Sequence, residues 1–196
     1  LCQKILKKIW VAKIPTRGLM IKILKNSKTQ SFTKLKTSIM GSNFPWTYSQ
    51  SVSRGEFNAE DVLYYEHPLY TRPEINGFSE PVSDYFQLSF KVMREILTEN
   101  DIDARRYFLL RMNINCTLPS DVPRFSRRHS DHSFDHMNFI LYLTGNGGST
   151  FVDRDIMDWE EHKPEEDQAI LFSGEHYMQL PERGRRIILI ATIMFH

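Results

Sequence analysis

The sequence predicts an α+β domain in which helices support one face of a β-sandwich or jelly roll. Helical periodicity is confined to the first half of the chain, and short apolar runs separated by turn residues fill most of the second half. The chain has 196 residues, of which 41% are hydrophobic and 25% charged, as in one globular domain of medium size. A core can therefore form without disulfides.

The N-terminal half contains two predicted helices. The first begins at Ser31, whose hydroxyl can cap the first turn, and ends at Gly41. The second and longer one runs from Ser79 to Glu99, with Pro81 in its first turn. Each has a core-facing apolar stripe: Phe32, Leu35 and Ile39 in the first, and Val82, Phe86, Phe90, Met93 and Leu97 in the second. Between and before them, the segments MIKIL, FPWTYSQSV and DVLYY are typical of strands.

From Arg106 onward the apolar pattern changes to that of short strands. Five segments rich in β-branched and aromatic residues are predicted strands: YFLLRMNIN, MNFILYLTG, STFVD, QAILFS and RIILIATIMF. The sequence GNGG at 145–148 predicts a hairpin, because glycine supplies the positive φ that such turns require. The C-terminal half is therefore expected to be mostly antiparallel sheet.

Charge is divided unequally along the chain, although the formal net charge is only +1. Residues 1–55 contain eleven Lys or Arg and no acid, whereas the remainder contains fourteen bases and twenty-four acids, so the two parts carry about +11 and −10. An acidic partner, an arm lying on the acidic body, or an added extension would each explain this division. Because the first Met is Met20, we divide the chain into a basic N-terminal extension, residues 1–19, and a single domain, residues 20–196.

The sequence predicts a cytoplasmic protein without a membrane partner. The longest uncharged apolar run, Ile187 to Phe195, is under half of the roughly 20 residues that a spanning helix needs. Lysines interrupt the first apolar segment, so no signal-peptide core is present there. Cys2 and Cys116 form neither a disulfide framework nor a CxxC zinc motif, which favours a reducing compartment.

Histidines cluster where the predicted β region begins, in a chain that lacks GxGxxG, GxxxxGK[ST], GxSxG and HExxH motifs. On a strand, residues i and i+2 point to one face, so His129 and Asp131 can offer an imidazole and a carboxylate to a single ion. His176, in SGEHYMQLP, would join them if the sheet closes. Two histidines and one carboxylate leave about three coordination positions open, as in non-haem Fe(II) oxygenases.

Arg186 opens the apolar run IILIATIMF, ten residues after His176. If its side chain points inward, its charge needs a partner, because burying an isolated ion is costly. An anionic cosubstrate would supply that partner, and the planar guanidinium suits a carboxylate. An exposed position at the start of the strand is the simpler alternative.

Residues 105–195 resemble the Fe(II)/2-oxoglutarate-dependent dioxygenases, in particular the small prolyl-4-hydroxylase-like members of bacteria and phages. The resemblance rests on the HxD motif, the run NFILYLTGNGGSTFV, the distal histidine and the arginine that follows it. It implies a double-stranded β-helix, which is a cupin-like jelly roll, with supporting N-terminal helices. It also implies three roles: His129, Asp131 and His176 ligate Fe(II), Arg186 pairs with the distal carboxylate of 2-oxoglutarate, and the Tyr142 hydroxyl hydrogen-bonds the same carboxylate.

The activity implied is hydroxylation of a C–H bond with Fe(II), 2-oxoglutarate and O₂. Peptidyl proline is the substrate that the resemblance favours, and a small molecule is an alternative. The basic arm, with Trp10, Phe44 and Trp46 available for stacking, favours nucleic acid instead. A non-catalytic jelly-roll module that keeps the metal site, and a cupin-like enzyme with another metal, are rivals from other classes.

The sequence departs from the family pattern at two places in the predicted strands. Asn138 stands where the family strand usually begins with Thr. Arg185 and Arg186 are adjacent and face opposite sides of their strand; we favour Arg186, because Ile188, Ile190 and Thr192 then line the interior.

Several polar residues also have simpler interpretations. Tyr142 has the alternative of an ordinary core tyrosine, and Cys116 is expected to be a small buried hydrophobe. His132 and His136 have the i, i+4 spacing of a helical zinc site, but the β-rich run that follows argues against a helix. The segment DRDIMDWEEHKPEEDQ is expected to be an acidic insertion, with Glu161 and His162 in solvent.

Overall fold

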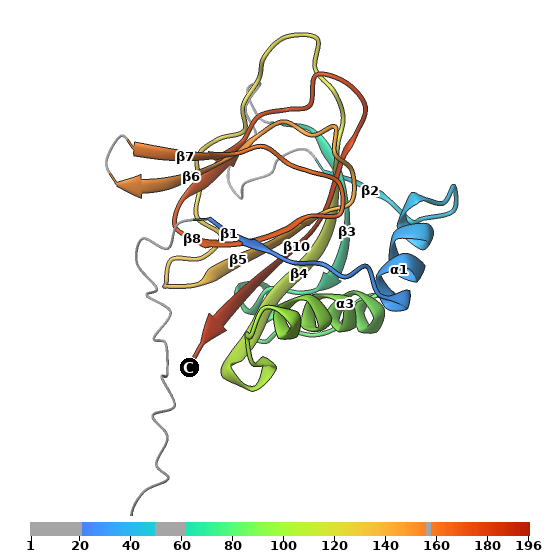
Figure 1. Ribbon diagram of the computed structural model, residues 1–196, viewed down its shortest axis with the longest axis vertical. Helices are drawn as coiled ribbons and strands as arrows, with labels where there is room; N and C mark the ends of the chain where they lie inside the picture. Colours follow the sequence, from blue (N-terminus) through green and yellow to red (C-terminus); the bar gives the residue numbers. More distant parts are fainter. Residues whose placement is uncertain (1–20, 50–61, 156–157) are drawn as a thin grey trace, which may run out of the picture.

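The computed structural model describes residues 21–49, 62–155 and 158–196 (Figure 1). Helical elements precede most of the strands in the chain, as the sequence predicted. The elements are β1 Lys22–Leu24, α1 Gln30–Met40, β2 Thr47–Ser49, β3 Tyr64–Tyr70, α2 Pro73–Asn76, α3 Phe86–Glu99, the 3-10 helix η1 Ala104–Arg106, β4 Tyr107–Thr117, β5 Met137–Tyr142, β6 Thr150–Asp155, β7 Asp158–His162, β8 Ala169–Ser173, β9 His176–Met178 and β10 Arg186–Phe195. The predicted extension, residues 1–19, lies outside the described residues.

Two antiparallel sheets make up the β layers. The larger sheet has seven strands in the order β1-β8-β5-β10-β4-β3-β2, and the smaller has three in the order β7-β6-β9. Figure 1 shows the smaller sheet lying over part of the larger one, with α3 across the opposite face of the larger sheet. The α+β prediction is confirmed, and the space between the two sheets is where the candidate site lies.

Strand β10 shows how the sequence separates the two faces of the large sheet. Alternate side chains point to opposite faces of a strand. Leu189 and its alternate neighbours join the main core with α1 and α3, whereas Ile188 and Ile190 join a second apolar cluster with Tyr142 and Phe172. This alternation turns Arg186 toward the space between the sheets, where it is buried, and leaves Arg185 exposed.

The long helix begins later than predicted, at Phe86 rather than Ser79. The residues before it are bonded to the strand β3 region instead. The Glu80 carbonyl accepts from the Thr71 N–H at 2.9 Å, and Pro81 bridges Tyr70. Val82, placed in the apolar stripe by its spacing, is therefore 49% exposed.

The residue predicted to cap the first helix was also wrong. The N-cap of α1 is Thr29, whose Oγ1 accepts from the Phe32 N–H at 3.2 Å. Ser31 instead donates to Glu95 on α3. The stripe of Phe32, Leu35 and Ile39 is buried as predicted, because it packs against α3 and the sheet.

The GNGG segment does not form a hairpin. It connects β5 in the large sheet to β6 in the small one, and its glycines do not have positive φ. These glycines meet a different requirement, namely close approach. A Cβ at Gly148 would lie 2.1 Å from the carbonyl oxygen of Gln179, and one at Gly147 would lie 2.6 Å from Cγ of Arg186.

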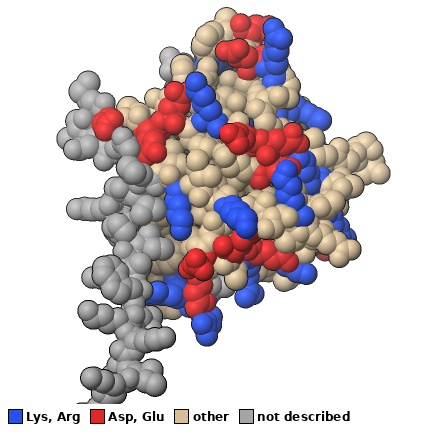
Figure 2. Space-filling model, viewed as in Figure 1, with Lys and Arg blue, Asp and Glu red and all other residues tan. Residues whose placement is uncertain are grey.

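Several lysines of the basic N-terminal part of the chain form ion pairs with acidic residues of the remainder. Lys25 pairs with Glu99, and both Lys28 and Lys36 pair with Asp167 in the loop before β8. On the face shown in Figure 2, basic and acidic side chains are intermixed. Among the described residues, basic side chains therefore lie partly on the acidic body of the same chain, which is the second of the three explanations for the charge division.

None of the described helices has the length and apolarity to cross a membrane.

Candidate metal centre

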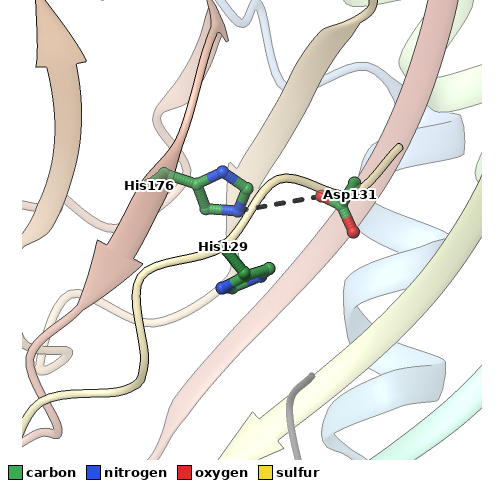
Figure 3. Close-up of side chains that lie close together, drawn as sticks. All are labelled: His129, Asp131 and His176. Atoms are coloured by element: carbon green, nitrogen blue, oxygen red, sulfur yellow. Dashed lines mark ion pairs between the residues drawn. The ribbon is translucent and has the colours of Figure 1, made fainter. Parts of the chain in front are cut away.

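His129 and His176 are brought together by their own backbones. The His129 N–H donates to the His176 carbonyl oxygen at 3.0 Å, and the His176 N–H donates to the His129 carbonyl oxygen at 2.9 Å. This isolated antiparallel bridge places the two imidazole rings with their centroids 4.5 Å apart (Figure 3). His176 is the first residue of β9. His129 lies outside the named strands, and this single bridge is enough to hold it beside His176.

Asp131 completes the group. It lies in a bend rather than in a strand, yet its carboxylate points to the same side as His129. Its Oδ2 lies 3.7 Å from Nε2 of His176, and one ligand atom from each of the three residues lies within 4.8 Å of the others. The convergence expected from the HxD spacing and the distal histidine is therefore present.

The chemistry of these three side chains fits a metal ion. Asp131 Oδ2 is buried and has no hydrogen-bond partner among the described residues. Nδ1 of His129 faces the Arg127 carbonyl at 3.0 Å, and Nδ1 of His176 faces the Gly174 carbonyl at 3.5 Å. A histidine that donates Nδ1–H to a carbonyl presents the Nε2 lone pair, which is the arrangement that a metal ligand needs.

The protonation states also suit ligation. Burial lowers the pKa of His176 to about 4, and the neighbouring His129 acts in the same direction against the opposing effect of Asp131. Burial acts to raise the pKa of Asp131, but the charges of Arg111, His176 and Arg72 hold it well below its usual range. At neutral pH the site therefore presents a neutral imidazole at His176 and an ionised carboxylate.

Arg186 lies in the same pocket as the triad, at the start of β10. It is 3% exposed, and its Nη2 donates to Thr150 Oγ1 at 2.9 Å while Nη1 faces the sulfur of Met178 at 3.3 Å. Among the described residues, its Nε has no hydrogen-bond partner and no carboxylate pairs with it. Burial lowers the pKa of Arg186, which reflects the cost of holding this charge away from water.

Tyr142 and Thr150 surround the guanidinium. The Tyr142 hydroxyl is hydrogen-bonded to Thr150 Oγ1 at 2.7 Å, and the guanidinium carbon of Arg186 lies 5.4 Å from the centre of the tyrosine ring. Burial raises the pKa of Tyr142, so its hydroxyl stays protonated. Thr150 was not among the residues predicted for the site. The alternation in STFVD, which turns Thr150 and Val152 inward, could have indicated it.

The wall between the triad and Arg186 is largely apolar. Ile188 and Ile190 of β10 and Ile140 of β5 line it, and Asn115 and Thr117 of β4 provide polar groups at its side. A ligand in this pocket would therefore meet the metal-ligating group, a guanidinium that pairs with no described carboxylate, and hydrocarbon walls.

The fold agrees with that of known oxygenases of one class. An oxidoreductase of the 2OG-Fe(II) oxygenase family from Burkholderia pseudomallei superposes with a TM-score of 0.63 at 15% identity, covering 84% of this chain and 77% of that one. This chain has the double-stranded β-helix fold of the 2OG-Fe(II) oxygenases. A prolyl hydroxylase from Trichoplax adhaerens, in complex with a hypoxia inducible factor peptide fragment, gives 0.60 at 13% identity, covering 92% and 84%. A prolyl-4-hydroxylase from Pseudomonas putida gives 0.53 at 14%, covering 92% and 94%. No family model and no curated protein match the sequence.

The remaining polar residues have other positions in this oxygenase fold. His162 is buried rather than solvated, and its ring stacks on Tyr142 at 5.5 Å. It lies at the end of β7, which pairs with β6, so the acidic insertion contains a strand of the smaller sheet. His132 contacts Glu74 and Thr192, whereas Cys116 belongs to the main core as expected.

Proposed function

We propose that this chain is an Fe(II)- and 2-oxoglutarate-dependent oxygenase that hydroxylates a C–H bond. One observation carries the proposal: a single pocket holds the His129–Asp131–His176 group and a buried arginine that pairs with no carboxylate of the described residues. A dianion with one carboxylate for Arg186 and a second end for the metal satisfies both features. The fold supports the same conclusion, since its structural neighbours are 2OG-Fe(II) oxygenases.

Each residue then has a defined task. His129, Asp131 and His176 would hold Fe(II), which together with O₂ and 2-oxoglutarate supplies the oxidising chemistry at the substrate C–H bond. Arg186 would bind the distal carboxylate through its planar donors, with the hydroxyl groups of Tyr142 and Thr150 beside it. The isoleucine wall would exclude water from the reacting atoms.

The overall reaction balances as substrate C–H, O₂ and 2-oxoglutarate giving substrate C–OH, succinate and CO₂. Peptidyl proline is the substrate that we propose first, because two of the neighbours are prolyl hydroxylases. A small molecule is the second candidate. It is favoured by the epimerase SnoN of nogalamycin biosynthesis, an α-ketoglutarate-dependent enzyme that superposes with a TM-score of 0.56 at 10% identity.

Turnover of labelled 2-oxoglutarate tests the proposal. The purified protein is incubated with Fe(II), O₂ and 2-oxoglutarate, with and without proline-containing peptides, and succinate is measured. We expect succinate formation that proline-containing peptides stimulate and that Arg186→Met abolishes. Absence of 2-oxoglutarate binding to the metal-loaded protein would refute the proposal, whereas binding without succinate under all conditions would favour a non-catalytic module.

Nucleic acid is less well supported as a substrate. Lys25, Lys28 and Lys36 belong to the basic part of the chain but are paired with acids of the same molecule. Phe44 is buried in the main core and Trp46 packs against it, so the expectation that these two rings are available for stacking was wrong. Trp10, the third ring, lies outside the described residues. Binding that weakens steeply with added salt would restore this candidate.

A further inference from the structure

Two arginines from separate elements converge on the carboxylate of Asp131. Arg72, which directly precedes α2, donates from Nη2 to Oδ1 at 2.7 Å and from Nη1 to the Asp131 carbonyl oxygen at 2.6 Å. Arg111 on β4 donates from Nη1 to the same Oδ1 at 2.7 Å. The side chains of all three are largely buried, so water screens these ion pairs only weakly.

The two oxygens of this carboxylate therefore have different surroundings. A carboxylate oxygen offers about two lone-pair sites, and on Oδ1 of Asp131 both are occupied by guanidinium groups. Oδ2 has no hydrogen-bond partner among the described residues and lies on the His176 side. Only Oδ2 is available to an ion between the two histidines.

We propose that Arg72 and Arg111 are positioning residues that restrict Asp131 to one-oxygen coordination. Aspartate binds metals through one oxygen or through both. A site of two histidines and one carboxylate leaves about three coordination positions open. If Oδ1 were free, the carboxylate would occupy one of these positions as well. The inference rests on the proposed function, since it assumes that a metal and 2-oxoglutarate share this pocket.

The segment that carries Arg72 also holds the residue after Asp131. Oε1 of Glu74 lies 2.5 Å from Nδ1 of His132, and Nε2 of His132 lies 2.8 Å from Thr192 Oγ1 on β10. Arg72 and Glu74 thus hydrogen-bond two consecutive residues of the bend, Asp131 and His132. This arrangement limits rotation of the Asp131 side chain and keeps Oδ1 against its two arginines.

The double variant Arg72→Met/Arg111→Met tests this role, because Met preserves apolar bulk and removes the donors. Mn(II) replaces Fe(II) as an air-stable probe. We expect crystal structures of the Mn(II) complexes to show Asp131 bound through Oδ2 alone in the parent and through both oxygens in the variant. We also expect calorimetry to show about tenfold weaker binding of 2-oxoglutarate to the Mn(II)-loaded variant. Arg105→Met, at an exposed pair with Asp103, is the matched control and should change neither.

Other outcomes separate the explanations. One-oxygen coordination in the double variant, with the 2-oxoglutarate affinity of the parent, would overturn the inference and leave the proposed function intact. One-oxygen coordination with weaker Mn(II) binding, on the order of 10–100-fold, would show that the arginines only hold the bend and would overturn it as well. Failure of the parent to bind Mn(II) would overturn the proposed function and this inference together.

Single variants keep the test usable if the double variant does not fold. Arg111→Met retains Arg72 and frees one lone-pair site of Oδ1, so two-oxygen coordination is again expected. Arg111→Lys restores a donor and should return Asp131 to one-oxygen coordination. A lysine variant that behaves like the methionine variant, in a protein with the thermal stability of the parent, would contradict the proposal.

Discussion

Gly147 lies directly against the side chain of Arg186. A Cβ at Gly147 would be 2.6 Å from Cγ and 2.9 Å from Cδ of the arginine, distances at which the side chain has to move. Arg186 is buried among Thr150, Met178 and Tyr142 and has little room to do so. The glycine is therefore part of the structure that sets the position of the guanidinium.

Gly147→Ala should weaken 2-oxoglutarate binding by displacing Arg186. We expect at least about tenfold weaker binding to the metal-loaded protein, because loss of a well-placed charged hydrogen bond costs on the order of 1.5–3 kcal/mol. Calorimetric titration checks this. Gly41→Ala, at a helix end far from the pocket with φ −70°, is the control and should bind 2-oxoglutarate like the parent. Unchanged affinity in Gly147→Ala would show that the arginine is not held by this contact.

Arg186→Met should stabilise the ligand-free protein while removing its affinity for 2-oxoglutarate. The buried guanidinium has no anion beside it among the described residues, and replacing such a charge by an apolar side chain of similar length removes its desolvation cost. We expect urea denaturation to show a free energy of unfolding higher by about 1 kcal/mol or more. Saturating 2-oxoglutarate should then stabilise the metal-loaded parent but not the variant. Retained binding in Arg186→Met would argue for a different anion site.

His176→Ala should abolish metal retention. The His176 imidazole is one of the three candidate ligands. Its backbone partner His129 is already another of the three, so it cannot take the place of the missing imidazole. Metal content after dialysis, measured by elemental analysis, provides the comparison with the parent. His196→Ala, which alters an exposed histidine next to Phe108, serves as the control and should keep the metal. Equal metal content in His176→Ala and the parent would exclude this site.

His162 should make the protein less stable as the pH falls below the ordinary histidine value. Burial lowers the pKa of His162, against the opposing effects of Gln168 and Glu165. Because its folded pKa is below about 6.5, the unfolded chain gains a proton first, and stability is lost between about 6.5 and the lower folded value. The slope is at most about 1.4 kcal/mol per pH unit for one proton.

His162→Phe should remove this contribution, since phenylalanine can stack on Tyr142 without titrating. Urea denaturation at a series of pH values compares the two proteins. Other buried histidines titrate in both, so the difference between the curves reports His162 alone. A constant difference across this pH range would contradict the prediction.

The alternation of side chains in the strands allowed the fold class and the inward face of β10 to be predicted. The same reasoning placed His129 and Asp131 on one face of a strand; Asp131 lies in a bend instead, but the convergence of both with His176 is present. These features depend on local periodicity, which a single sequence records. The start of α3 was wrong because residues 79–81 bond to the β3 region, a tertiary contact that overrides helical spacing.

The residues that surround the candidate ligands and the arginine pocket could not be predicted in this way. Arg72 lies 59 positions before Asp131, and its role depends on where the short helix α2 lies in space. His162 was expected in solvent because acidic residues flank it, yet pairing of β7 with β6 turns it inward. Such contacts are set by the three-dimensional path of the chain, and no spacing in the sequence encodes them.

The reciprocal hydrogen bonds between His129 and His176 have a consequence for how the ion is acquired. The bridge fixes the main chain of both residues, so folding alone brings the two imidazoles within reach of one ion, and only their side-chain rotations remain to be set. Loading then costs little conformational entropy. The protein should therefore acquire its metal without a slow rearrangement of the main chain.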